Sequence, residues 1–137
     1  MSFAVGWVYL VAGTLATMVV GALWYSPLLF AGPWMRSLGL RDGDIEASGV
    51  PAAPGYLAST LYSLAITFLI GVLTTNLTVS GPGGYLAVAT GLWLVTSGLA
   101  NLRIKYFEDR PWPLYVVDEG YALAVHFVLG FLAWLLA

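Results

Sequence analysis

Two long stretches of this sequence, residues 3–24 and 56–79, contain no charged side chain. A helix needs about 20 apolar residues to cross the roughly 30 Å of hydrocarbon in a bilayer. Both stretches reach that length, and residues 85–102 and 113–136 are similar. Their apolar residues run continuously and do not alternate, which favours helices over the strands of a membrane barrel. The sequence therefore predicts four membrane-spanning helices.

The composition points to lipid as the solvent. Only 9% of the residues are charged, whereas soluble domains have about a quarter. Apolar residues make up 60% of the chain, more than a small soluble domain can bury. We therefore expect an all-α integral membrane protein, a four-transmembrane-helix antiparallel bundle with a single domain over residues 1–137. The first apolar run follows no basic residue and is too long for a signal peptide, so we expect a retained helix.

Proline, glycine and aromatic residues set the predicted helix ends, at 3–27, 55–79, 85–102 and 113–136. The segment Trp24-Tyr25-Ser26-Pro27 closes the first helix, since the residue before proline resists helical geometry and aromatics favour the interface. Residues 80–84 (SGPGG) form a tight turn, and Pro113 opens the fourth helix. Loops 31–54 and 103–112 complete the chain. Residues 33–39 have the composition of a short interfacial helix that stops at Gly39.

All basic residues fall in the two loops, and none lies near the termini or in the turn at residues 80–84. They are Arg36, Arg41, Arg103, Lys105 and Arg110. Basic loops face the cytoplasm in multi-pass membrane proteins. We therefore expect the loops on the cytoplasmic side and both termini on the outer side.

Small residues predict where helices pack closely, because they let backbones approach each other in lipid. One such seam on the first helix comprises Gly13, Thr17 and Gly21, and one on the third comprises Ala87, Gly91 and Gly98.

The fourth helix has two distinct faces at helical spacing. A small and polar stripe, expected to face the bundle, comprises Tyr115, Glu119, Ala122, His126, Gly130 and Ala133. A bulky stripe, expected to face lipid, comprises Leu123, Phe127, Phe131 and Leu135.

Three ionisable residues lie within this helix. Asp118 and Glu119 lie where hydrocarbon begins, and His126 lies roughly 10 Å deeper on the same stripe as Glu119. The acids are either interface anchors, favoured near a helix N-terminus, or part of a functional site. His126 either marks a proton-sensitive pathway near the membrane midplane or bonds a neighbouring helix. Its possible partners are Thr14, Thr17, Thr67, Thr90, Thr96 and Ser97.

The block from Asn101 to Tyr121 carries most of the chain's charge. Glu108 and Asp109 can pair with the basic residues around them, while Asn101 can bond Tyr106 or the loop backbone. An anchoring loop against lipid headgroups is the simplest interpretation. Trp112 and Tyr115 would hold it at the interface.

Several classes of chemistry find no support in the sequence. The chain has no cysteine and one histidine, so metal sites built from nitrogen and sulfur are not expected. No nucleophile–base set or phosphate-binding glycine loop occurs. We expect no cofactor, and no basic pattern suggests nucleic acid.

Two segments carry a family resemblance. Residues 21–30 (GALWYSPLLF) with Trp34-Met35, and a later block with Asn101, residues 106–108 (YFE), Arg110, Leu114-Tyr115 and Gly120-Tyr121, resemble the signatures of a bacterial membrane family known as domain of unknown function 1761. The resemblance implies a small four-helix protein of the bacterial cytoplasmic membrane, without a settled activity. Its polar positions correspond to Trp24, Tyr25, Ser26, Asn101, Glu108, Arg110, Asp118 and Tyr121. Glu119 and His126 lie outside those signatures.

These observations suggest a polar site at the cytoplasmic mouth of the bundle, which binds or passes a small polar solute or ion. The residues of the family signatures would form the entrance, with Glu119 and His126 deeper. Four helices enclose little space, so we expect a homo-oligomer among membrane lipids. The alternative is a structural or assembly subunit that packs through the small-residue seams. An intramembrane enzyme acting on lipids is the weakest hypothesis.

Overall fold

The computed structural model describes residues 1–137 and is all-helical, with four helices long and apolar enough to cross a membrane. The first is α1 (Trp7–Trp24), the second α4 (Ala53–Asn76) and the last α7 (Trp112–Leu135). The third runs without a break through α5 (Gly81–Trp93), the π-helix η1 (Leu94–Gly98) and α6 (Leu99–Phe107). The predicted fold class is confirmed.

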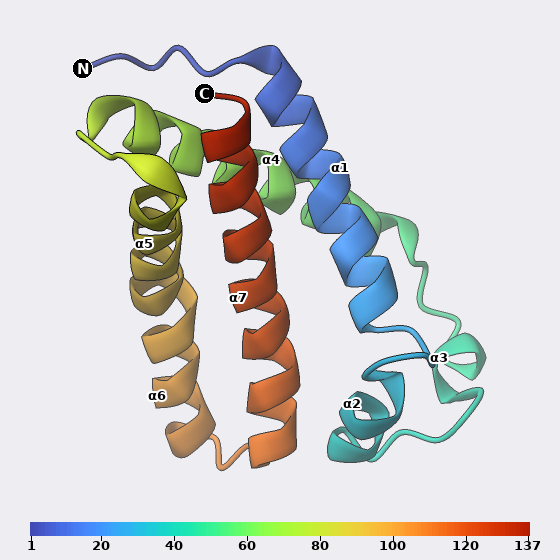
Figure 1. Cartoon of the computed structure of the whole chain (residues 1–137). Coiled ribbons are helices and arrows are strands. Elements are labelled where there is room, and N and C mark those ends of the chain that lie inside the picture. The colour runs from blue at the N-terminus through green and yellow to red at the C-terminus, as the bar shows by residue number, and fades with distance from the viewer.

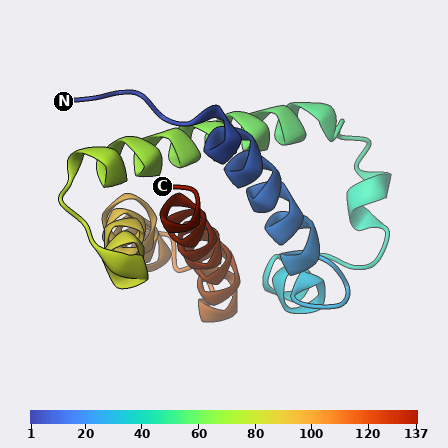
Figure 2. The same ribbon diagram turned by 45° about the horizontal axis from the view of Figure 1, so that its top comes forward.

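Helix α7 lies at the centre of the molecule. It packs against α1 on one side and against α5 on the other (Figure 1). Helix α4 runs obliquely across these helices and contacts all three (Figure 2). The short helices α2 (Ala31–Ser37) and α3 (Asp44–Ala47) lie beyond the end of α1. Helix α2 is the predicted short helix, and Gly39 follows it with a φ of 70°.

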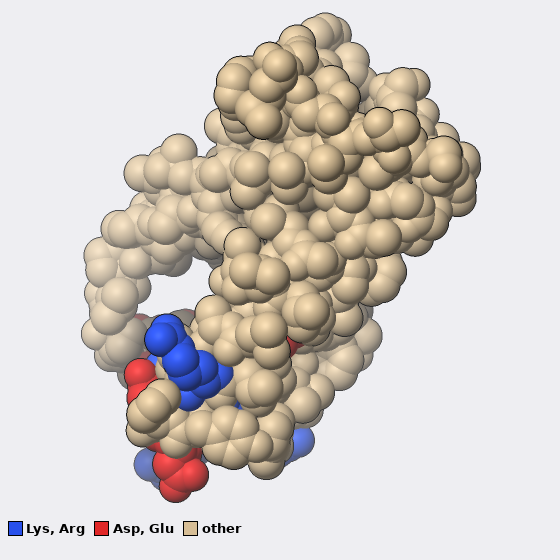
Figure 3. All heavy atoms as spheres, turned by 90° about the vertical axis from the view of Figure 1, so that its left-hand side faces the viewer, with Lys and Arg blue, Asp and Glu red and all other residues tan.

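The two ends of the bundle differ in charge. Every charged side chain lies between residues 36 and 46 or between residues 103 and 119. Both segments lie at the end that carries α2, α3 and the α6–α7 turn, hereafter the charged end (Figures 1 and 3). Both termini and the turn between α4 and α5 lie at the opposite, uncharged end.

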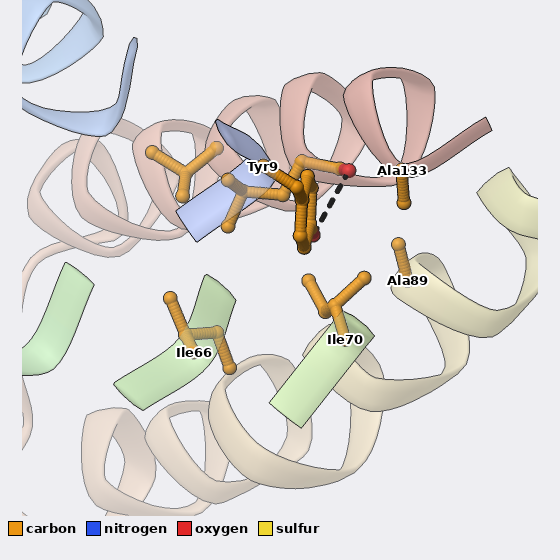
Figure 4. Close-up of a cluster of buried hydrophobic side chains, with 7 residues drawn as sticks. Tyr9, Ile66, Ile70, Ala89 and Ala133 are labelled. Atoms are coloured by element: carbon orange, nitrogen blue, oxygen red, sulfur yellow. Dashed lines mark hydrogen bonds between the residues drawn. The ribbon is translucent and has the colours of Figure 1, made fainter. Parts of the chain in front are cut away.

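The apolar core lies between the helices towards the uncharged end and draws on all four spans (Figure 4). Its members are Tyr9, Ile66, Ile70, Ala89, Val125, Leu129 and Ala133. The Tyr9 hydroxyl donates to the backbone oxygen of Leu129 at 3.2 Å. Close packing needs glycine at position 130, because a Cβ there would lie 2.9 Å from that of Ala89.

The predicted seam on the first helix is confirmed. Gly13 and Thr17 are buried, and a Cβ on Gly13 would lie 2.5 Å from Thr67 of α4 and 2.9 Å from Leu129 of α7. Gly21 likewise packs against the Tyr121 ring.

Within the single chain, the predicted seam on the third helix is not the packing surface. Ala87 is exposed, and a Cβ added to Gly91 would meet nothing within 4 Å. Gly98 is buried but packs against Trp93 of its own helix. The buried position is Ala89, which meets Gly130 of α7. Small residues occur on both faces of this helix, so size alone does not indicate which face is covered.

The predicted boundaries of the third helix also shift. It starts at Gly81, with Pro82 in its first turn, so the connection to α4 is residues 77–80. It continues to Phe107, so the first half of the predicted loop 103–112 is helix. No glycine or proline interrupts residues 99–110, and charged side chains at a helix end can reach water.

The predicted faces of α7 are present. Glu119, His126, Gly130 and Ala133 are buried, while Phe127, Phe131 and Leu135 are exposed. The helix therefore presents its small and polar stripe to the bundle.

Candidate functional site

The most elaborate polar cluster in the molecule surrounds the Glu119 carboxylate. This residue of α7 is only 5% exposed. One carboxylate oxygen accepts from Trp93 Nε1 at 3.2 Å and from Ser97 Oγ at 2.8 Å. The other accepts from Asn101 Nδ2 at 2.6 Å. Three neutral donors on one helix thus hold a carboxylate on the next.

The π-helix aligns these three donors. They are spaced four residues apart on the third span, and four residues of an α-helix exceed one full turn. Side chains at that spacing would therefore drift around the helix. The wider turn of η1 offsets the drift, so the donors share the face that meets α7. Such π-segments occur frequently at functional sites.

The neighbouring acid faces the other side of α7. Asp118 accepts a hydrogen bond from the Tyr25 hydroxyl at 2.7 Å, and Trp24 Nε1 donates to the backbone oxygen of Val117 at 2.9 Å. Burial, followed by the hydrogen bond to Asp118, raises the pKa of Tyr25 well above its usual range. Two adjacent carboxylates of α7 thus tie it to both flanking helices.

A small polar cavity opens beside these carboxylates at the charged end. Its volume is about 100 Å³. The residues that line it carry both signs of charge and come from α6, α7 and the turn between them; they are Asn101, Lys105, Arg110, Leu114, Tyr115, Asp118 and Glu119. The cavity is the place where a polar solute can reach Glu119.

Lys105 is the buried cation of this cavity, with 8% exposure. Its Nζ lies 5.0 Å from the centre of the Tyr106 ring and 4.7 Å from that of Trp112. Cation–π attraction holds the ammonium there. The only ion pair of the structure joins Arg110 to Glu108, so no carboxylate lies within 4.0 Å of Lys105.

The cavity brings together four of the ten predicted site residues, namely Asn101, Arg110, Asp118 and Glu119. Tyr25 joins them through Asp118. Trp24 supports α7 from outside, and Ser26 only bonds the backbone oxygen of Leu23.

The other predicted residues lie elsewhere. Glu108 is an exposed partner of Arg110, which confirms that pairing within the loop. Tyr121 borders a separate groove of about 490 Å³ between α1 and α4, together with Tyr25, Ser59 and Ser63.

His126 is fully buried in the apolar interior and lines none of the five cavities. Its Nδ1 lies 2.7 Å from the backbone oxygen of Ala122, which can only accept, so Nδ1 carries the proton. Its Nε2 has no partner. None of the six hydroxyl side chains considered from the sequence bonds to it.

The prediction for Asn101 is corrected. It bonds neither Tyr106 nor the loop backbone, because α6 continues for six residues beyond it and carries it into the bundle. At that depth Asn101 faces Glu119.

Four contributors to the cluster were not predicted for the site: Trp93, Ser97, Lys105 and Tyr115. One sequence feature could have indicated this cluster, namely the spacing of Ser97 and Asn101, two polar side chains one turn apart in an apolar helix. Lys105 falls in the predicted loop 103–112, where burial is not expected. The Tyr115 hydroxyl donates a hydrogen bond to the backbone oxygen of Gly98, which links η1 to α7.

No group of three His, Cys, Asp or Glu residues is arranged to hold a metal ion. The polar side chains that line the cavity instead carry two carboxylates, an amide, a phenol, an ammonium and a guanidinium. These suit the recognition of a small polar molecule.

No curated protein and no solved structure matches this chain. A family model described as "Protein of unknown function (DUF1761)" matches residues 8–133. That match spans α1 to α7 and includes every residue of the cavity. The chain therefore belongs to the DUF1761 family.

Proposed function

We propose that this protein binds a small polar solute in the cavity at its charged end. The observation that carries the proposal is the Glu119 carboxylate, which is buried, held by three neutral donors and open to the cavity. An ionisable group inside a membrane protein is costly and commonly marks a functional site.

The hydrogen bonding of Glu119 leaves capacity for a ligand. A carboxylate offers about four acceptor positions. Three are used, two on one oxygen and one on the other. No basic side chain lies within 4.0 Å, so its charge has no ion-pair partner. A solute with a donor group would complete the set.

Binding is better supported than passage through the bundle. Beyond Glu119, α7 continues into the packed core at His126 and Leu129, both with no exposed surface. A second cavity, of about 470 Å³, lies at the uncharged end next to Tyr9 and Tyr85. A route between the two cavities would require these core side chains to move.

We place the charged end on the cytoplasmic side of a bacterial inner membrane, with both termini outside, because all five basic residues lie at this end. The chain has no cysteine, so single cysteines at Ser37 and Gly83 report the orientation directly. In intact cells, an impermeant thiol reagent should label Gly83→Cys and not Ser37→Cys. The reverse pattern would refute this orientation.

The binding proposal is tested by thermal stabilisation of the purified protein in detergent. Four small probes cover the charge classes: methylammonium, acetate, glycine and acetamide. We expect at least one to stabilise the wild type and to lose that effect in Glu119→Gln. Glu46→Gln, an exposed acid of α3 that lines no cavity and forms no ion pair, should respond like the wild type. No response to any probe, or the same response in both variants, would refute binding at this site.

The second candidate is a structural or assembly subunit. It is favoured by the exposed Ala87 and Gly91, which form a small-residue surface without a neighbour. A second copy packed there would make a homo-oligomer through helices that approach closely. Gly91→Leu should then lower the molecular mass of the detergent-solubilised complex. An unchanged mass would speak against this surface as an interface.

A further inference from the structure

We infer that the cavity takes a small zwitterion, a solute with an ammonium group and an anionic group on the same or adjacent carbon atoms. The inference rests on the proposed binding function and specifies the class of solute. It comes from the way charges of opposite sign border one space without touching.

The cavity has a positive and a negative side. Lys105 and Arg110 lie on one side, in α6 and the turn that follows it, and Asp118 and Glu119 lie on the other, in α7. No basic nitrogen of the first pair lies within 4.0 Å of a carboxylate oxygen of the second. Opposite charges attract strongly where water is scarce, so these basic side chains would be expected to pair with the carboxylates. A structural cause must therefore keep them apart.

Neutral partners provide that cause. The Lys105 ammonium rests against the rings of Tyr106 and Trp112. Glu119 is held by Trp93, Ser97 and Asn101. The charges are therefore fixed before a ligand arrives, which lowers the cost of binding.

The Asp118 carboxylate is also held in place, by the Tyr25 hydroxyl. Arg110 differs, because it pairs with the exposed Glu108. Lys105 is consequently the cation of the cavity that lacks a carboxylate partner.

Size and charge together limit the ligand. A volume of about 100 Å³ corresponds to roughly three water molecules. A simple cation would satisfy the carboxylates and leave Lys105 without an anion, and a simple anion would do the opposite. A compact zwitterion satisfies both sides at once, with its ammonium at Asp118 and Glu119 and its anionic group at Lys105.

Two kinds of molecule at the membrane interface contain such a zwitterion. One is a dissolved solute of the α-amino acid type. The other is the phosphoethanolamine headgroup of a lipid, since Trp112 and the α6–α7 turn lie at the end of the spans. Both have the same chemistry, and the experiment separates them.

The test compares three probes that differ by one charged group. Glycine carries both charges, methylammonium lacks the carboxylate and acetate lacks the ammonium. Their binding to the full-length protein in uncharged detergent is measured by equilibrium dialysis. We expect glycine to bind at least about tenfold more tightly than either partial probe, because each charged contact adds to affinity. Methylammonium or acetate binding as tightly as glycine would overturn the inference.

Two variants with the same loss of charge locate the effect. Lys105→Gln removes the cavity cation, and Arg103→Gln removes an exposed cation from the same helix. We expect Lys105→Gln to abolish the advantage of glycine over methylammonium and Arg103→Gln to preserve it. If Lys105→Gln is poorly folded by circular dichroism, Lys105→Arg replaces it and should retain a glycine preference. Equal preference in Lys105→Gln and the wild type would refute the assignment.

The lipid source is tested in nanodiscs of phosphatidylcholine, with or without phosphatidylethanolamine. Undiminished glycine binding in both supports a dissolved solute. Displacement by phosphatidylethanolamine supports the headgroup, and both results support a zwitterion site. If no probe binds under any condition, the proposed function itself fails. If methylammonium binds and glycine has no advantage, only the zwitterion inference fails.

Discussion

Glu119 and His126 lie on one face of α7, about two turns apart, and both are almost fully buried. Glu119 accepts three hydrogen bonds from the third span and borders a cavity. His126 bonds only to its own helix, and its second nitrogen faces no polar partner. Burial alone therefore does not mark a functional residue. The partners supplied by neighbouring helices distinguish the two.

The largest expected effect is the removal of the Glu119 carboxylate. Glu119→Ala leaves Trp93, Ser97 and Asn101 with buried donors unpaired, so the free energy of unfolding should fall by roughly 3 kcal/mol. Reversible unfolding in mixed detergent micelles measures the change. Glu119→Gln should cost less, about 1 kcal/mol, because its amide oxygen still accepts while its nitrogen faces a donor. A smaller loss in Glu119→Ala than in Glu119→Gln would contradict the role of the carboxylate.

A substitution at Gly130, one helical turn beyond His126, tests how tightly this region is packed. In Gly130→Ala the new methyl group would lie 2.9 Å from the Ala89 Cβ and 3.1 Å from the Tyr85 backbone oxygen. Overpacking of this kind should cost about 2 kcal/mol in the same unfolding assay.

Gly91→Ala is the matched control for this substitution, since a Cβ at Gly91 meets nothing within 4 Å. It should leave stability unchanged or raise it slightly, as alanine favours helices. Equal losses in the two variants would show that α5 and α7 are not tightly packed near the core.

The link between Asp118 and α1 should contribute less. Tyr25→Phe removes the hydroxyl that donates to Asp118 and should lower the free energy of unfolding by about 1 kcal/mol near neutral pH.

This contribution should also depend on pH. Because the pKa of Tyr25 is raised in the folded protein, its stabilisation is complete below the ordinary tyrosine value of 10.0 and is lost as the pH rises above it. The difference between wild type and Tyr25→Phe should therefore shrink above pH 10.0. A difference that grows with pH would refute the hydrogen bond.

The smallest expected effect comes from His126. His126→Leu replaces a ring with one unpaired nitrogen by an apolar side chain, so stability should change by less than about 1 kcal/mol or increase. Solute binding at the Glu119 cavity should be unaffected, which equilibrium dialysis measures. A loss of stability comparable to that of Glu119→Ala would erase the contrast between the two residues.

The sequence predicts the spans and the faces of α7 well, for a physical reason. Lipid demands long apolar helices, and a helix with small residues on one side and bulky ones on the other has only one suitable face for packing. The predicted burial of Glu119, His126 and Gly130 follows from that periodicity.

The candidate site is less predictable because it depends on where the third helix ends. With an end at Leu102, Asn101 lies in the last turn of the helix at the interface, and Lys105 lies in the loop that follows. With the end at Phe107, both enter the bundle and reach the cavity. The π-helix that aligns Trp93 and Ser97 with Asn101 has no signature in the sequence.

The location of all charged side chains at one end of the bundle affects how the chain enters the bilayer. The uncharged end has polar groups such as Asn76, which exchanges two hydrogen bonds with the backbone of Ser2, but no ionised side chain. Carrying this end through hydrocarbon therefore requires no charged side chain to shed its water. Each helical hairpin can be inserted from the charged side, while every charged side chain stays at that end of the bundle.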